Sequence, residues 1–195
     1  MQTLLLSYFL AFFAIVIVWP TWRLWRRERI NALVLPRDDS AHGVIGRWFK
    51  GLMAGMYVLV LALGFGLDVE LLGRLRWAEH EAARLAGWAL LGVGLVVIVL
   101  AQAQMGRSWR MGIDAQRPTA LVMEGIFARS RNPIFLGMRL NVAGLFLLVP
   151  CGVTLAILLL GEALIAVQVR LEEAHLASTL GADYRAYLTR VPRWV

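Results

Sequence analysis

The sequence has little of what soluble proteins and disulfide-bonded proteins depend on. Charged residues make up only 17% of its 195 positions while apolar residues make up 59%, which excludes an ordinary soluble domain. Its single cysteine, Cys151, has no partner for an intrachain disulfide. The formal net charge is +7, but the basic residues are spread between apolar segments, so nucleic acid is not an expected partner.

Motifs for metals and for Rossmann-type nucleotide binding are also missing. The histidines, His42, His80 and His175, do not have the spacing of metal ligands, and we expect no metal site. No GxGxxG occurs, so a cofactor would have to be held in another way.

Long intervals without a charged residue are what the sequence does have. Four of them cover residues 1–22, 51–67, 85–106 and 140–161. Because about 20 apolar residues cross a hydrocarbon core of about 30 Å, these intervals predict membrane-spanning helices. We expect the first three spans near residues 4–22, 51–67 and 85–105.

The fourth interval allows two interpretations. Residues 140–161 could form one span, or residues 134–169 could form two, separated near Pro150 and Gly152. Proline disfavours helix in the residue before it, which predicts a turn at 149–152. A hairpin also keeps the later arginines on the same side as the earlier basic clusters, so we favour five spans.

Charge between the spans predicts the orientation. The cluster after the first span is strongly basic, whereas residues 68–84 carry mixed charges, so the positive-inside rule puts the N-terminus outside and the C-terminus in the cytoplasm. A polar loop with Pro36, Arg37 and Asp38, leading through Arg47 and Lys50, should connect the first two spans. Further cytoplasmic charges are expected at Arg107, Arg110, Arg117, Arg129 and Arg131.

These observations predict an all-α, polytopic membrane helix bundle of about five spans, with a C-terminal helical hairpin and a cytoplasmic cofactor pocket. We expect a single integral membrane domain over residues 1–195, with three N-terminal spans in 1–106 and a catalytic core in 107–195. Arginine is used in place of lysine almost throughout, Lys50 excepted, and we expect a bacterial inner membrane protein.

Several polar residues flank or interrupt the hairpin. Asn132 is a candidate N-cap, with Pro133 at the first helical position. Arg139 falls inside a span, where a charge indicates function unless the side chain reaches the interface. Glu172 and Glu173 are 100° apart on a helix, so only one can face the site. An exposed pair between Arg170 and Glu173 is the alternative.

The order of these residues resembles a known family. Residues 108–194 resemble the isoprenylcysteine carboxyl methyltransferases, whose pattern is Arg-His-Pro, an aromatic residue, Gly, a hydrophobic hairpin, Glu-Glu, Leu, Gly, two tyrosines and Val-Pro-Arg-aromatic. Asn132 replaces the usual His, and Phe135 replaces the common Tyr. The matching residues are Arg131-Asn132-Pro133, Phe135, Gly137, Glu172-Glu173, Leu176, Gly181, Tyr184, Tyr187 and Val191-Pro192-Arg193-Trp194.

The resemblance implies an S-adenosylmethionine pocket on the cytoplasmic side and a lipid-like methyl acceptor that enters from the bilayer. Membrane lipids are the other expected partners. The implied catalytic residues are Arg139, Glu173 and Arg193. The implied cofactor-binding residues are Arg131, Asn132, Pro133, Phe135, Gly137, Glu172, Glu173, Tyr184 and Tyr187.

The chemistry of this cofactor agrees with the residue types. Phe135 or a tyrosine could lie against the sulfonium or the adenine, Glu172 or Glu173 could hold the amine or the ribose, and Arg131 could bind the carboxylate. We expect methylation of a carboxylate, with Arg139 or Arg193 binding an anionic acceptor. The alternatives are N-methylation of a phospholipid or small amine, a nicotinamide-dependent reductase, and a non-enzymatic membrane protein on the same fold.

Overall fold

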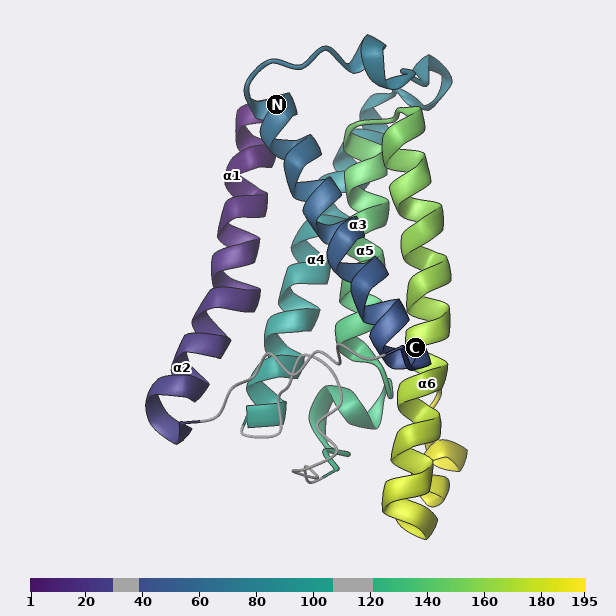
Figure 1. The fold of residues 1–195 in the computed structure, drawn as a ribbon. Helices are drawn as coiled ribbons and strands as arrows, with labels where there is room; N and C mark the ends of the chain where they lie inside the picture. The colour runs from purple at the N-terminus through teal and green to yellow at the C-terminus, as the bar shows by residue number, and fades with distance from the viewer. Residues whose placement is uncertain (30–38, 107–120) are drawn as a thin grey trace.

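The protein is a bundle of long helices packed side by side (Figure 1). The structure, a computed structural model, describes residues 1–29, 39–106 and 121–195. No strand occurs in these ranges, and four helices are long and apolar enough to cross a membrane. A fifth apolar helix has only 16 residues. The predicted all-α polytopic bundle is therefore confirmed.

The first span is longer than predicted, because helix continues past residue 22. It runs from α1 (Gln2–Phe13) through a π-helical turn, η1 (Ala14–Val18), into α2 (Trp19–Glu28). Pro20 has no N–H, so the carbonyl of Val16, four residues earlier, loses its helical donor. Gln102 donates to that carbonyl from Nε2 over 2.9 Å. A side chain of another helix thus supplies the hydrogen bond that the Val16 carbonyl lacks because of the proline.

The second span begins about ten residues earlier than predicted. Helix α3 (Ala41–Gly64) starts after Ser40, whose Oγ accepts a hydrogen bond from the backbone N–H of Gly43 at 3.1 Å. Arg47 and Lys50 consequently lie on this helix and not in a loop. The expected loop residues Pro36, Arg37 and Asp38 lie outside the described residues, as do Arg107, Arg110 and Arg117.

The third span, α4 (Glu81–Met105), packs closely against α5 (Pro133–Leu148) because glycines face each other. A Cβ on Gly94 would lie 2.8 Å from the carbonyl oxygen of Gly137, and one on Gly137 would lie 2.7 Å from that of Gly94. Gly87, seven residues before Gly94, and Gly144, seven residues after Gly137, repeat this arrangement. The two backbones therefore touch at two levels, as is common between membrane helices.

The predicted hairpin turn is confirmed. Helix α5 ends at Leu148, and α6 (Gly152–Arg190) begins three residues after Val149. The segment that carries η2 (Val69–Leu72) and η3 (Arg76–Ala78) covers this turn. Gly152 N–H donates to Gly73 O at 2.9 Å, and Leu75 N–H donates to Pro150 O at 2.8 Å.

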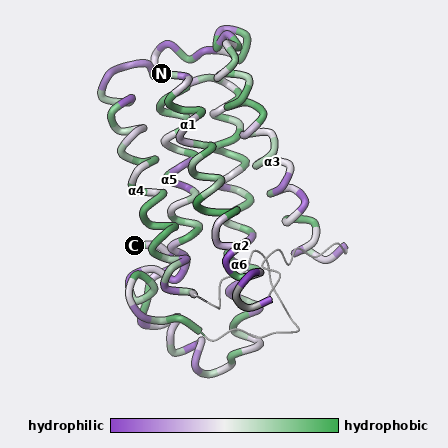
Figure 2. Tube along the Cα trace, turned by 90° about the vertical axis from the view of Figure 1, so that its left-hand side faces the viewer, coloured by the Kyte–Doolittle hydropathy of each residue, from purple (hydrophilic) through white to green (hydrophobic). Residues whose placement is uncertain are grey.

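The N-terminus, residues 65–80 and the hairpin turn share one end of the bundle (Figure 1). Hydrophobic residues dominate the long helices between the two ends of the bundle (Figure 2). Hydrophilic residues gather at the end with the hairpin turn, and at the opposite end around α2 and the last part of α6. The candidate site lies at the second, opposite end. Which end faces the cytoplasm stays a prediction.

Candidate functional site

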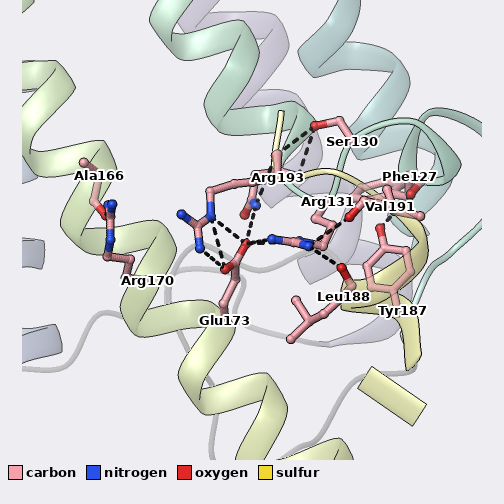
Figure 3. A network of polar contacts seen from close by, with 11 residues as sticks. Phe127, Ser130, Arg131, Ala166, Arg170, Glu173, Tyr187, Leu188, Val191 and Arg193 are labelled. Carbon is pink, nitrogen blue, oxygen red and sulfur yellow. Dashed lines mark hydrogen bonds and ion pairs between the residues drawn. The ribbon is translucent and has the colours of Figure 1, made fainter. Parts of the chain in front are cut away.

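Glu173 is the centre of a polar network where α5 begins and α6 leaves the apolar part of the bundle (Figure 3). Its Oε1 accepts hydrogen bonds from Arg131 Nε at 3.2 Å and from Asn132 Nδ2 at 3.1 Å. Arg193 approaches from the C-terminal tail, with Nη2 2.7 Å from Oε2. Only 8% of Glu173 is exposed, so two guanidinium groups neutralise a carboxylate inside the protein.

Arg131 has all three guanidinium nitrogens against protein acceptors. Nε and Nη2 each lie 3.2 Å from Glu173 Oε1. Nη1 donates to the carbonyls of Leu188 and Val191, both at 2.9 Å. Since these acceptors belong to two parts of α6 and to the tail, Arg131 holds the C-terminal segment against the start of α5.

The C-terminal tail is also fixed by the backbone and side chains before α5. Arg131 N–H donates to Pro192 O at 3.0 Å, and Ser130 Oγ donates to Arg193 O at 3.3 Å. Asn132 Nδ2 donates to the same Arg193 carbonyl at 3.4 Å. The hairpin thus brings two polar segments together that are about 60 residues apart in the sequence.

Arg193 forms the open edge of the network. About a third of its side chain is exposed, compared with 10% of the Glu173 side chain. Its hydrogen bond to Glu173 raises the pKa of the guanidinium above the ordinary value. Arg193 is therefore a permanent cation that both supports Glu173 and reaches the surface.

The two tyrosines pack inside the C-terminal segment. Gly181 has φ +59° and ψ −122°, which breaks the helical path of α6 before its last turns. Tyr184 and Tyr187 follow this break, and each is only 2% exposed. The hydroxyl of Tyr187 donates to Phe127 O at 2.6 Å, in η5 (Gly125–Ala128). These rings hold the segment in place and present no open face.

A second ion pair lies deeper in the bundle. Arg139 of α5 contacts Glu162 of α6, with Nη2 2.7 Å from Oε2 and Nε 2.8 Å from Oε1. The Trp194 ring lies against the guanidinium, with 4.6 Å from its centroid to Cζ. At about 1.5 Å per residue, both charged residues are about 15 Å from the hairpin turn. About a third of each side chain is exposed, so this charged pair is partly open although it lies between two apolar helices.

The other predicted residues have different surroundings. Asn132 and Pro133 precede and start α5 as predicted, but the Asn132 side chain does not cap the helix, because its amide donates to Glu173. Gly137 lies in the contact with α4, away from this network. Phe135 is partly buried in the first turn of α5.

Of the two adjacent glutamates, Glu173 faces the network. Glu172 is partly exposed and accepts no hydrogen bond from the residues that the structure describes. Arg170 Nη1 donates to Ala166 O at 2.7 Å (Figure 3), so the alternative pair between Arg170 and Glu173 is wrong.

Sequence reasoning did not assign site roles to Ser130 and Glu162. A signal for Glu162 was present: Arg139 precedes Pro150 by 11 residues, and Glu162 follows Cys151 by 11. In a tight helical hairpin, residues at equal distances from the turn lie opposite each other. Ser130 has no such signal, because its partner is a backbone carbonyl of the tail.

Comparison with known protein families gives one match that covers much of this architecture. A family model described as Phospholipid methyltransferase matches residues 82–183, which is more than half of the chain. The chain belongs to this family. The match includes α4, α5, the hairpin turn and most of α6. Neither a curated protein nor a solved structure matches the chain.

Family membership establishes the general activity. This phospholipid methyltransferase family lies in the same superfamily as the isoprenylcysteine carboxyl methyltransferases, so the resemblance is confirmed for the superfamily and not for that specific family. The protein is an integral membrane methyltransferase that acts on lipid-like substrates. Members of the family generally use S-adenosylmethionine.

Proposed function

We propose that this phospholipid methyltransferase transfers a methyl group from S-adenosylmethionine to the amine of a phospholipid headgroup. The observation that carries the proposal is the Arg139–Glu162 pair. Arg139 and Glu162 place a cation and a carboxylate side by side, and about a third of each side chain is exposed. A headgroup with a phosphate and an amine is complementary to one arginine and one glutamate together.

The open residues around the network suit the cofactor. Bound S-adenosylmethionine supplies an electrophilic methyl group on a sulfonium. None of the described residues donates a hydrogen bond to the Glu172 carboxylate, which suits the ammonium or ribose hydroxyls of the cofactor. Arg193 has an exposed guanidinium edge for the carboxylate of the cofactor. Phe135 offers an aromatic ring in the first turn of α5, three residues after Asn132.

The remaining predicted residues support the site by fixing its shape. Glu173 and Arg131 already engage each other, and the Tyr187 hydroxyl already has a backbone acceptor. We therefore assign Glu173, Arg131, Tyr184 and Tyr187 to positioning the tail. This differs from the direct cofactor contacts that the resemblance implies.

Orientation and exclusion of water carry most of the catalysis in this proposal. Arg139 holds the headgroup phosphate, and Glu162 accepts a hydrogen bond from the ammonium. An ammonium must lose a proton before its nitrogen can attack, and Glu162 Oε is the group that would accept that proton. The free amine could then take the methyl group that bound S-adenosylmethionine would supply, with the neutral thioether as the leaving group.

Carboxyl O-methylation is the second candidate, because residues 108–194 resemble enzymes with that activity. Product analysis separates the two. Purified protein is supplied with methyl-labelled cofactor and with either phosphatidylethanolamine or a fatty acid. We expect label in the phospholipid that is stable to mild alkali, since methyl esters hydrolyse and N-methyl groups do not. Alkali-labile label on the fatty acid would identify the second candidate as correct.

The variant Glu162→Gln tests the role of the deeper pair. It keeps the size of the side chain and removes its charge and basicity. We expect methyl transfer to fall by about 10²-fold or more, with unchanged binding of S-adenosylhomocysteine by calorimetry. Methyl transfer at the wild-type rate would overturn the assignment of Glu162, and absent binding to the folded wild-type protein would overturn the cofactor assignment.

A further inference from the structure

An apolar crevice lies between four helices at the depth of the Arg139–Glu162 pair. It is a narrow, partly open space between α1, α3, α5 and α6. Its walls include Phe12 of α1, Phe49 and Met53 of α3, Met138 of α5 and Gly161 of α6. Residues from α1 and α3 lie outside the segment 82–183 that the family match covers. The N-terminal spans therefore contribute a wall to this space.

The chemistry of the walls favours a hydrocarbon occupant. Among the described residues that line the crevice, only Asn141 is polar. Its Oδ1 accepts a hydrogen bond from the Tyr8 hydroxyl at 2.5 Å, and its Nδ2 donates to Gly137 O at 2.9 Å. Water would find few free partners there. Methionine side chains such as Met53 can adapt to a flexible chain.

The crevice lies directly beside the charged pair. Met138 and Gly161, which line it, are the chain neighbours of Arg139 and Glu162. Ile165 also lines it and lies three residues after Glu162, on a neighbouring part of the same helix surface. A molecule with a charged head at the pair could therefore place a hydrocarbon tail in the neighbouring crevice.

We propose that the crevice binds one acyl chain of the phospholipid acceptor, and that α1 and α3 thereby select its length. This inference rests on the proposed function, because the charged head of the same lipid would lie at Arg139 and Glu162. The N-terminal spans then form part of the substrate site as well as the membrane anchor.

Photocrosslinking tests this site without methyl transfer. The wild-type protein in detergent, free of cofactor, is mixed with phosphatidylethanolamine that carries a diazirine near the end of one acyl chain. Mass spectrometry then locates the crosslinks. We expect them on α3, between Phe49 and Met56, and on α6, between Ile157 and Ile165.

Two glycine variants provide the matched comparison. A Cβ on Gly161 would lie 3.7 Å from Leu52 Cδ2 and 3.8 Å from Val142 Cγ1, so Gly161→Leu fits its first atom and extends into the crevice. Gly92 is exposed on α4 with nothing within 4 Å, so Gly92→Leu adds the same side chain elsewhere. We expect crevice crosslinks to fall by at least about fivefold in Gly161→Leu only.

Each outcome decides the proposal. Crosslinks spread evenly over the lipid-facing helices, or equal labelling in both glycine variants, would overturn it. Specific labelling by a diazirine fatty acid but not by the phospholipid would overturn the phospholipid as occupant. Specific phospholipid labelling without any methyl transfer would leave the site standing and refute the proposed function. If Gly161→Leu does not fold, Met53→Trp narrows the crevice from α3 and is expected to give the same loss.

Discussion

The two neighbouring glutamates of α6, Glu172 and Glu173, differ in burial and in hydrogen bonding because they face different directions on the helix. Glu173 receives hydrogen bonds from Arg131, Asn132 and Arg193 and is almost fully buried. Glu172, one residue earlier, points about 100° away and has no such donor among the described residues. The first is suited to holding the protein together, and the second is suited to binding a ligand.

Paired substitutions of these glutamates should separate stability from binding. Glu173→Gln removes the charge that balances two guanidinium groups, so we expect the free energy of unfolding to fall by about 3 kcal/mol. Glu172→Gln should leave stability nearly unchanged and weaken S-adenosylhomocysteine binding by about tenfold or more. Denaturant titration and calorimetry in detergent measure both effects. Equal loss of stability in the two variants would contradict this division.

At the scale of helices, two contacts hold α4 in place. Gln102 of α4 donates a hydrogen bond to the Val16 carbonyl of the first span. Pro20 has no N–H and cannot donate this bond. Eight residues before Gln102, α4 also meets α5 through the glycine pair of Gly94 and Gly137. Helix α4 therefore connects the N-terminal span to the hairpin that carries the site.

A double-mutant cycle tests the first contact. Gln102→Leu leaves the Val16 carbonyl without a donor in apolar surroundings, and we expect a loss of about 1–2 kcal/mol in unfolding free energy. Pro20→Ala restores an N–H four residues after Val16, so the same Gln102→Leu change should then cost less. A coupling energy near zero in denaturant titrations would show that the two residues act independently.

Two alanine variants of α4, Gly94→Ala and Gly92→Ala, test the glycine contact between α4 and α5. A methyl group on Gly94 would lie 2.3 Å from Asn141 Nδ2 and 2.8 Å from Gly137 O, so we expect Gly94→Ala to cost about 1–3 kcal/mol. Gly92→Ala, with nothing within 4 Å, should be neutral or slightly stabilising because alanine favours helix. Thermal unfolding followed by circular dichroism in one detergent compares them. A Gly94→Ala protein as stable as wild type would refute the close backbone contact.

Over the whole molecule, the features that hydrocarbon thickness controls could be predicted from the sequence. Charge-free intervals indicated the spans, and Pro150 indicated the turn, because both follow from helix length and backbone geometry. The partners of Glu173 could not be predicted in detail, since they come from two separate segments, residues 131–132 and the tail. Close packing on α4 requires a glycine at position 137, and the expected cofactor role of Gly137 stays a prediction.

The predicted orientation is testable in intact cells. Residues 65–80 lie at the end of the bundle opposite the site, so labelling should distinguish Glu70 from Val195. In a Cys151→Ala background, Glu70→Cys should react with an impermeant maleimide from outside, and Val195→Cys should react only after the cells are opened. Labelling of Val195→Cys in intact cells would reverse the proposed topology.

The shortness of α5 has a consequence for how the lipid is handled. Its 16 residues span about 24 Å, so its first turn begins about 6 Å short of a hydrocarbon layer about 30 Å thick. The reactive groups then occupy a recess below the level of the surrounding headgroups, and a lipid can be modified without leaving its leaflet. Turnover in vesicles should accordingly vary with bilayer thickness, because a thicker bilayer buries the recess further from the aqueous cofactor.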